Sequence, residues 1–211
     1  LNTLFQLYQS LKGLRTEPHA MKFETVETYM TFDELGGIKE ILPRSRNEAH
    51  KLIEECMLLA NVAAAEYALE NDIPMLYRVH EPPEFSRIQK VREYVKLLGL
   101  PFPEQPTQKD YQAVIEATKE RIDAPSIHAV LLRSMMQAYY GPNNAGHFGL
   151  AYEAYTHFTS PIRRYPDLLL HRALKAHLNK KPSPLSGGVL EEAGSHFSAT
   201  ERRADEASRS V

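Results

Sequence analysis

The stretch HFGLAYEAYTHFTSPIRRYPDLLLH (147–171) carries the densest group of chemically informative residues in the chain. Histidines and aromatic rings alternate there with Thr159, Ser160, Arg163 and Arg164, around a predicted helix start at Ser160–Pro161. The free N–H groups of a helix N-terminus, together with hydroxyls and guanidinium groups, can hold a phosphate. The interleaved rings can stack on unpaired bases. The stretch therefore favours a phosphate-binding site flanked by stacking surfaces.

A purely structural interpretation of the same residues is also open. The aromatic residues of the core would then be Tyr152, Tyr155 and Phe158. Arg163 and Arg164 would pair with Asp167 on the surface, at i+4 and i+3, and the histidines would be polar residues without a special role. Composition alone favours this alternative, because structural ion pairs resemble functional clusters.

The N-terminal half predicts a helix, a hairpin and a second, longer helix. Leucines at helical spacing predict a helix over 1–14. Residues 21–32 and 38–42 are β-prone and flank a turn, which predicts a β-hairpin. A capping box formed by Ser45 and Glu48 opens a helix that runs to about Glu70. Its segment 56–65 is apolar on nearly every face, which predicts a buried central helix.

The remaining pattern predicts short strands and further helices. MLYRVH (75–80) is typical of a short strand, and apolar spacing predicts helices over about 84–98, 108–121 and 125–140. The helix that begins at Ser160–Pro161 runs to about Leu178, an exposed linker follows at 179–188, and a last helix begins near Val189. These elements predict an α+β fold that is mostly helical, with a β-hairpin and short strands packed against a helical bundle.

Composition places the chain among soluble globular proteins. It has 211 residues, of which 43% are hydrophobic and 25% are charged. The single cysteine, Cys56, excludes an internal disulfide and favours an intracellular, cytoplasmic protein. The apolar runs are far shorter than the roughly 18 residues of a membrane span. The net charge of −2 gives no argument for nucleic-acid binding by itself.

Candidate metal ligands and buried polar groups lie apart in the sequence. No two of the six aspartates are closer than 13 residues, so no clustered acidic Mg²⁺ site is encoded locally. His171 and His177 lie about 240° apart on one helix and cannot share a metal ion. Glu55 and Asn61 border or interrupt an apolar run and are candidates for buried polar groups that need partners. The alternative places them on a solvated helix surface.

Several segments, in order, resemble the RNB-type exoribonucleases, the family of ribonuclease II and ribonuclease R. In the densest stretch the resemblance rests on H-F-G-L (147–150), Tyr155, H-F-T-S-P-I-R-R-Y (157–165), and Asp167 followed by His171. It extends over nearly the whole chain, through RNEAHKLIEECMLLANVAAAEY (46–67), RVHEPP (78–83), LLRSMMQA (131–138) and ERRADEASR (201–209).

The resemblance implies that residues 1–211 are the C-terminal two-thirds of a catalytic RNB domain. The aspartates that bind Mg²⁺ and the cold-shock-like domains would then lie N-terminal to this region, and an S1-type domain C-terminal to it. LRTEPHA (14–20) stands in place of the family's short basic stretch, which weakens the case for RNA contacts there. The chain opens without Met and stops within a helical pattern, so we expect a fragment of a longer protein.

The activity implied by the resemblance is processive 3′-to-5′ hydrolysis of single-stranded RNA, with release of nucleoside 5′-monophosphates and Mg²⁺ as cofactor. By motif position, Arg163 contacts the scissile phosphate, Glu55 is an active-site glutamate, and Phe23 stacks on the 3′-terminal base. The remaining RNA-binding residues, which line a channel too narrow for a duplex, would be Tyr155, His157, Thr159, Ser160 and Arg164.

We expect the complete protein to be monomeric, and the 211 residues alone to be inactive and to bind no metal tightly. The alternative is a non-catalytic helical RNA-binding or adaptor module that kept the signature. Aspartates clustered upstream would favour the enzyme, and their replacement would favour the module.

Overall fold

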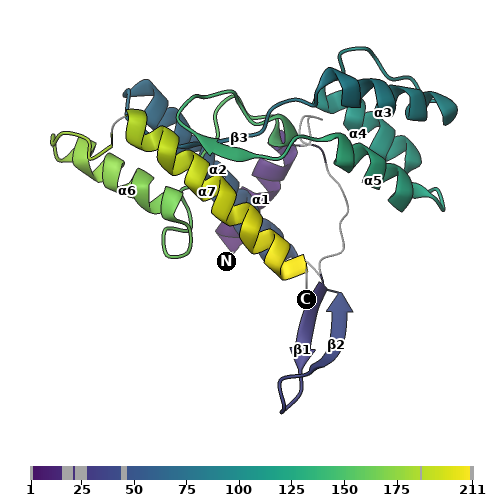
Figure 1. Ribbon diagram of the computed structural model, residues 1–211, viewed down its shortest axis with the longest axis horizontal. Coiled ribbons are helices and arrows are strands. Elements are labelled where there is room, and N and C mark those ends of the chain that lie inside the picture. The colour runs from purple at the N-terminus through teal and green to yellow at the C-terminus, as the bar shows by residue number, and fades with distance from the viewer. Residues whose placement is uncertain (1, 16–20, 22–27, 44–46, 186, 210–211) are drawn as a thin grey trace.

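The computed structural model describes residues 2–15, 21, 28–43, 47–185 and 187–209, and most of them are helical (Figure 1). The helices are α1 (Asn2–Arg15), α2 (Glu48–Glu70), α3 (Phe85–Leu97), α4 (Gln108–Thr118), α5 (Ala124–Ser134), α6 (Tyr165–Leu178) and α7 (Gly187–Arg209), with a 3₁₀ turn η1 (Phe148–Leu150). The strands are β1 (Thr28–Phe32), β2 (Ile38–Pro43), β3 (Tyr77–Val79) and β4 (Tyr139–Gly141), in the antiparallel pairs β1–β2 and β3–β4. The expected α+β, mostly helical class is confirmed.

One hydrophobic core lies between α2, α6, α7 and the β3–β4 pair (Figure 1). Its buried side chains include Ala65 and Ala68 of α2, Val79 of β3, Leu170 of α6 and Leu190 of α7. The alanines let neighbouring elements approach α2 closely, because they carry only a methyl group. This core supports the 147–171 stretch.

Helix α7 packs directly on β4 through two small residues. The Tyr140 N–H donates to Ser198 Oγ (2.9 Å), and the Ser198 hydroxyl donates to the Gly194 carbonyl (2.7 Å). A Cβ on Gly194 would lie 2.6 Å from the Tyr140 carbonyl oxygen, so this approach requires glycine. An ion pair between Arg78 and Glu201 (2.6 Å) ties the same helix to β3.

A second core lies within the α3–α4–α5 group, on the right of Figure 1. Its buried residues include Val91, Val95, Tyr111, Ile115, Ile127 and Leu131. Phe148 of η1 packs against this cluster, and its ring meets the Tyr111 ring edge to face at 6.1 Å. The 3₁₀ turn is therefore anchored on this second core.

The predicted hairpin forms, with β1 starting at Thr28, and residues 22–27 of its expected first strand lie outside the described residues. It projects away from the helices instead of packing against them as expected (Figure 1). Its turn is closed by Asp33, whose Oδ1 accepts hydrogen bonds from Leu35 N (2.9 Å) and Gly37 N (2.8 Å). Gly36 has φ +81°, a conformation that glycine adopts without steric cost.

Helix α2 begins later than predicted and has a different cap. Asn47 Oδ1 accepts the His50 N–H (3.0 Å), and His50 Nδ1 accepts the Asn47 N–H (3.4 Å). The capping box is therefore formed by Asn47 and His50, and Ser45, the predicted cap, lies outside the described residues.

Three large apolar residues on the apolar faces of α3, α2 and α5 are exposed: Phe85 by 68%, Leu59 by 48% and Leu132 by 46%. Each lies on a helix whose covered face is narrower than its apolar stripe. The expected burial of 56–65 is therefore correct only for part of α2, where Leu58 and Asn61 are buried.

Two predicted helix boundaries are wrong. Helix α5 ends at Ser134 instead of continuing to 140, because Met135 turns extended (ψ 149°) and residues 139–141 pair with β3. Helix α6 begins at Tyr165 instead of Ser160–Pro161. The Ser160 carbonyl accepts the N–H groups of Arg163 (3.2 Å) and Arg164 (3.0 Å), which makes one separate turn before the helix.

Residues 179–185 lead from α6 towards α7 without helix or strand, and they are exposed except for Leu185, which is buried in the first core.

Among the described helices, none combines the length and apolar character needed to cross a membrane. The cytoplasmic location stays a prediction.

Candidate functional site

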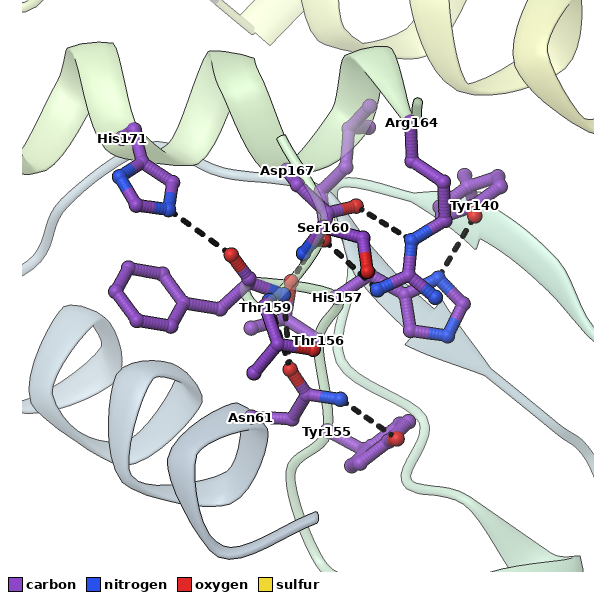
Figure 2. Close-up of polar contacts among 12 residues, drawn as sticks. Asn61, Tyr140, Tyr155, Thr156, His157, Thr159, Ser160, Arg164, Asp167 and His171 are labelled. Carbon is purple, nitrogen blue, oxygen red and sulfur yellow. Dashed lines mark hydrogen bonds and ion pairs between the residues drawn. The ribbon is translucent and has the colours of Figure 1, made fainter. Parts of the chain in front are cut away.

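Residues 155–160 form an extended segment that lies between α2 and α6 (Figure 2). Asn61 of α2 holds it: the side-chain oxygen accepts the N–H groups of Phe158 (2.9 Å) and Thr159 (3.3 Å). The Asn61 amide also donates to the Tyr155 hydroxyl (2.9 Å). Asn61 is 1% exposed, so these bonds supply the partners that its buried amide requires.

Helix α6 holds the same segment from the other side. The Ser160 N–H donates to Asp167 Oδ1 (2.8 Å), and His171 Nε2–H donates to the Phe158 carbonyl (2.9 Å). The rings of Phe158 and His171 are stacked, 4.3 Å apart. Side chains thus pair the N–H groups of Phe158, Thr159 and Ser160, while the Tyr155 carbonyl accepts the backbone N–H of Arg78 in β3 (2.8 Å).

Arg164 and Asp167 form a two-point ion pair beside this segment (Figure 2). Arg164 Nε donates to Oδ2 (3.0 Å) and Nη2 donates to Oδ1 (2.8 Å). Asp167 has no exposed surface. The expected i+3 pair is therefore present, but it lies in the interior and not on the surface, and the i+4 pair of Arg163 with Asp167 is absent from the contacts of the described residues.

His157 and Tyr140 share a hydrogen bond (2.8 Å) on the inner side of the segment. Burial, followed by the nearby Arg164 charge, lowers the pKa of His157 to about 2. Burial raises the pKa of Tyr140 to about 12. Both groups are therefore neutral at physiological pH, and positive charge in this region comes from the arginines.

A second pair of histidines fixes η1. His80 Nδ1 accepts the Gly149 N–H (2.7 Å), so its Nε2 carries the proton and donates to the Met136 carbonyl (2.7 Å). His147 Nδ1 accepts the Leu150 N–H (3.1 Å), and burial followed by the neighbouring His80 lowers its pKa to about 3. The two imidazoles act here as neutral acceptors of backbone hydrogen bonds.

Aromatic rings continue from these histidines into the extended segment. The Tyr155 ring is stacked with Tyr152 (5.8 Å, 13°) and meets the edges of His147 (5.2 Å) and His157 (5.9 Å). Tyr155 is 4% exposed, so its ring is a core residue, as the structural interpretation expected. A direct stacking contact of Tyr155 with RNA stays a prediction.

The structure brings most predicted site residues together. Four of them lie half-buried in the segment and at the start of α6: His157, Thr159, Ser160 and Arg164. The Thr159 hydroxyl is buried and finds no partner in the described part of the chain. Arg163 is exposed on the turn before α6, and among the described residues its guanidinium makes no hydrogen bond or ion pair.

Two predicted residues are placed differently. Glu55 lies half-buried on α2 and has interactions of its own, one and two-thirds helical turns before Asn61. Phe23 lies outside the described residues. No contact in the described part of the chain tests the role implied for either.

Sequence reasoning did not assign partners to Asn61 or a role to His80. The signal for Asn61 was a polar residue in an apolar run, which identified the need for partners but not their positions. His80 lies in RVHEPP (78–83), and the sequence carried no signal that its ring accepts a bond from Gly149, 69 residues later.

The described residues do not form a magnesium site. No three His, Cys, Asp or Glu side chains among them converge on one point. The only aspartate in 147–171 is Asp167, whose oxygens are engaged by Arg164 and the Ser160 N–H. Since Mg²⁺ is held by several free oxygen ligands, it does not fit this arrangement, and no chemical step is assigned to it.

Residues 1–180 match the RNB domain family. The chain belongs to the RNB family. Among RNB-family relatives, ribonuclease R of Vibrio cholerae is 46% identical over 225 aligned residues, which cover 100% of this chain and 27% of that protein. The resemblance to bacterial ribonuclease R is therefore confirmed.

Solved structures of other proteins share this fold. Mycoplasma genitalium RNase R in complex with ribose-methylated single-stranded RNA superposes with a TM-score of 0.89 at 28% identity, over 100% of this chain and 34% of that one. Yeast Ssd1, described as a pseudonuclease, shares the fold at 22% identity with a TM-score of 0.71, over 93% of this chain and 25% of its own. The chain thus spans about a third or less of the relatives that it matches.

Proposed function

We propose that the complete gene product containing these residues is a 3′-to-5′ exoribonuclease, which hydrolyses single-stranded RNA processively to nucleoside 5′-monophosphates. The observation that carries the proposal is the contrast between two adjacent arginines. Arg164 is paired with buried Asp167, whereas the guanidinium of Arg163, on the turn that this pair fixes, is exposed and has no hydrogen bond or ion pair with the part of the chain that the structure describes. A positioned, unpaired guanidinium is suited to a phosphodiester.

In this proposal Arg163 binds the scissile phosphate and stabilises the charge that develops on its oxygens. Glu55 acts as a carboxylate at the same site, and Phe23 stacks on the 3′-terminal base. Mg²⁺ as the cofactor of the complete enzyme remains part of the proposal, and its ligands would have to come from outside the described residues.

Single-stranded RNA is the proposed partner. The likeness to an RNase R that was solved with single-stranded RNA supports it. The segment 155–160 is fixed by side chains on both sides, so a channel along it cannot widen freely for a duplex. His157, Thr159 and Ser160 would line this channel, and the protein would act as a monomer.

We further propose that the 211 residues alone are inactive, because their one signature aspartate is already paired. The test incubates the 211-residue chain and the complete gene product with an end-labelled single-stranded oligonucleotide and Mg²⁺. Stepwise release of mononucleotides is expected from the complete product alone. Mononucleotide release by the 211 residues, above a mock purification, would refute their inactivity.

A non-catalytic RNA-binding or adaptor module is the second candidate. The fold it shares with a yeast pseudonuclease favours it, because that fold is compatible with a protein without nuclease activity. RNA binding by the complete product without any mononucleotide release would support the module and contradict the enzyme.

A further inference from the structure

The extended segment 155–160 lacks the hydrogen-bond ladder that a strand would provide. Its N–H groups at Phe158, Thr159 and Ser160 all donate to side-chain oxygens, two of them to Asn61 and one to Asp167. Buried backbone N–H groups need such partners. The first residues of the segment are held by backbone groups, since the Tyr155 carbonyl accepts the Arg78 N–H and the Thr156 hydroxyl donates to the Leu76 carbonyl. The path of 158–160 is set by the side chains that accept its N–H bonds.

Among the side chains that bind the segment, Asn61 comes from a different helix. Asp167 and His171 both belong to α6, only a few residues further along the chain than the segment. Asn61 belongs to α2 and bonds to partners 94 and 97 residues away. It is thus the side chain whose bonds join the signature segment to the helix of Glu55.

These bonds also determine where the Arg163 turn begins. Thr159 is held by Asn61, the next residue is Ser160, and its carbonyl accepts the N–H groups of Arg163 and Arg164. The turn is therefore held on one side by Asp167, through Ser160 and Arg164, and on the other by Asn61, through Phe158 and Thr159. Asn61 is thus one of the side chains that hold the Arg163 turn relative to α2, the helix that carries Glu55.

We propose that Asn61 is a positioning residue: its amide holds the Arg163 turn at a fixed distance from the α2 carboxylate, so that both act on one phosphodiester. This inference rests on the proposed exoribonuclease activity. Asn61 is 1% exposed and does not touch the substrate, so its effect passes through the backbone of 158–160.

The test compares Asn61→Leu and Asn61→Asp in the complete gene product. Leucine has similar size and receives no hydrogen bond, whereas aspartate can accept the same two N–H bonds and a bond from the Tyr155 hydroxyl. With saturating single-stranded RNA, Asn61→Leu should lower kcat by about 10²-fold, because misplacement by about 1 Å has effects of that size. KM should stay nearly constant, and Asn61→Asp should recover most of kcat.

Hydrogen exchange supplies a second readout. The amides of Phe158 and Thr159 should lose protection in Asn61→Leu and keep it in Asn61→Asp. If Asn61→Leu does not fold, Asn61→Ser, which is smaller and polar, replaces it with the same expectations. The matched control is Asn144→Leu, since Asn144 also bonds to two backbone groups, Glu153 O and Gly146 N, but in a separate loop; its kcat should equal wild type.

The outcomes separate this inference from the proposed function. A wild-type product that releases no mononucleotides overturns both. An active wild type with unchanged kcat in Asn61→Leu, or an equal loss of kcat in the leucine and aspartate variants, overturns the positioning role alone.

Discussion

Asp167 accepts both ends of the Arg164 guanidinium fork while it has no exposed surface of its own. The pair also takes the Ser160 N–H, so one carboxylate fixes a backbone group and a side chain at once. An ion pair of this kind, desolvated and fully hydrogen-bonded, is sensitive to the loss of one partner.

Asp167→Ala should destabilise the fold by about 3–5 kcal/mol, because it leaves the Arg164 charge mostly buried and unpaired. Urea unfolding followed by far-ultraviolet circular dichroism measures this. Asp205→Ala, on the exposed face of α7, is the control and should be close to neutral. A loss below about 1 kcal/mol for Asp167→Ala would mean that the pair is effectively solvated.

Gly194→Ala should destabilise by about 1–3 kcal/mol, because the new Cβ would lie 2.6 Å from the Tyr140 carbonyl oxygen and α7 must shift from β4. Alanine normally stabilises a helix relative to glycine, so a loss of stability in Gly194→Ala would indicate the steric contact with Tyr140. Gly188→Ala, with nothing within 4 Å, provides the comparison and should be neutral or slightly stabilising. The melting temperatures of the two variants measure the difference. Equal changes in melting temperature for Gly194→Ala and Gly188→Ala would contradict the close contact of α7 with β4.

Acid should weaken the fold through His147 and His157. In the folded chain their pKa values are lowered from the usual 6.5 to about 3 for His147 and about 2 for His157. At a pH between these lowered values and 6.5, the unfolded chain therefore binds more protons than the folded chain. Stability is then fully present above about pH 6.5 and falls as the pH drops toward 3, by at most about 1.4 kcal/mol per pH unit for each group.

His157→Gln should reduce this slope, since it removes one titrating group and keeps a partner for Tyr140. Unfolding free energies at about pH 6 and pH 5, above most carboxyl titrations, measure it. The exposed His196, changed to Gln, is the control for the substitution itself. A slope unchanged in His157→Gln would show that His157 titrates alike in both states.

Arg163→Ala and Glu55→Ala should lower turnover in the complete gene product by roughly 10²–10³-fold, more than they weaken RNA binding. Their proposed interactions act mainly in the transition state. Arg133→Ala, on the exposed face of α5, is the control and should leave turnover unchanged. Equal losses of affinity and turnover would indicate a binding or folding role instead.

Phe23→Ala should cost roughly 1–3 kcal/mol of single-strand binding and change the length of the end product, because few other contacts would hold the last nucleotides. Phe23→Tyr should be nearly silent, since it keeps the ring. If Phe23 were a core residue, truncation would instead cost about 3–5 kcal/mol of stability. A large drop in melting temperature with an unchanged product ladder would exclude the stacking role.

Local patterns predicted the elements that local forces determine. The β1–β2 hairpin followed from β-prone runs around Asp33, and the end of α2 at Glu70 followed from its apolar run, although its start and cap were predicted wrongly. The start of α6 could not be read locally, because Ser160–Pro161 satisfies the rules of a helix cap while Asp167, seven residues later, takes the Ser160 N–H.

The candidate site was predictable in its residue types and less so in its connections. The Arg164–Asp167 pair followed from spacing, but its burial depends on the packing of α6. The end of α5 and the partners of Asn61 depend on segments about 60 and 95 residues away, which sequence periodicity does not encode.

Asp167 and His171 are one helical turn apart on α6, and they bind Ser160 and Phe158, which are two residues apart in an extended chain. Four helical residues rise about 6 Å, and two extended residues span about 6.6 Å. The spacing of the two side chains along α6 therefore matches the spacing of the two backbone groups along the segment. Deleting or inserting one residue between 158 and 160, or between 167 and 171, would put one of the two contacts out of register with the other. The length of this part of the chain is therefore as constrained as its composition.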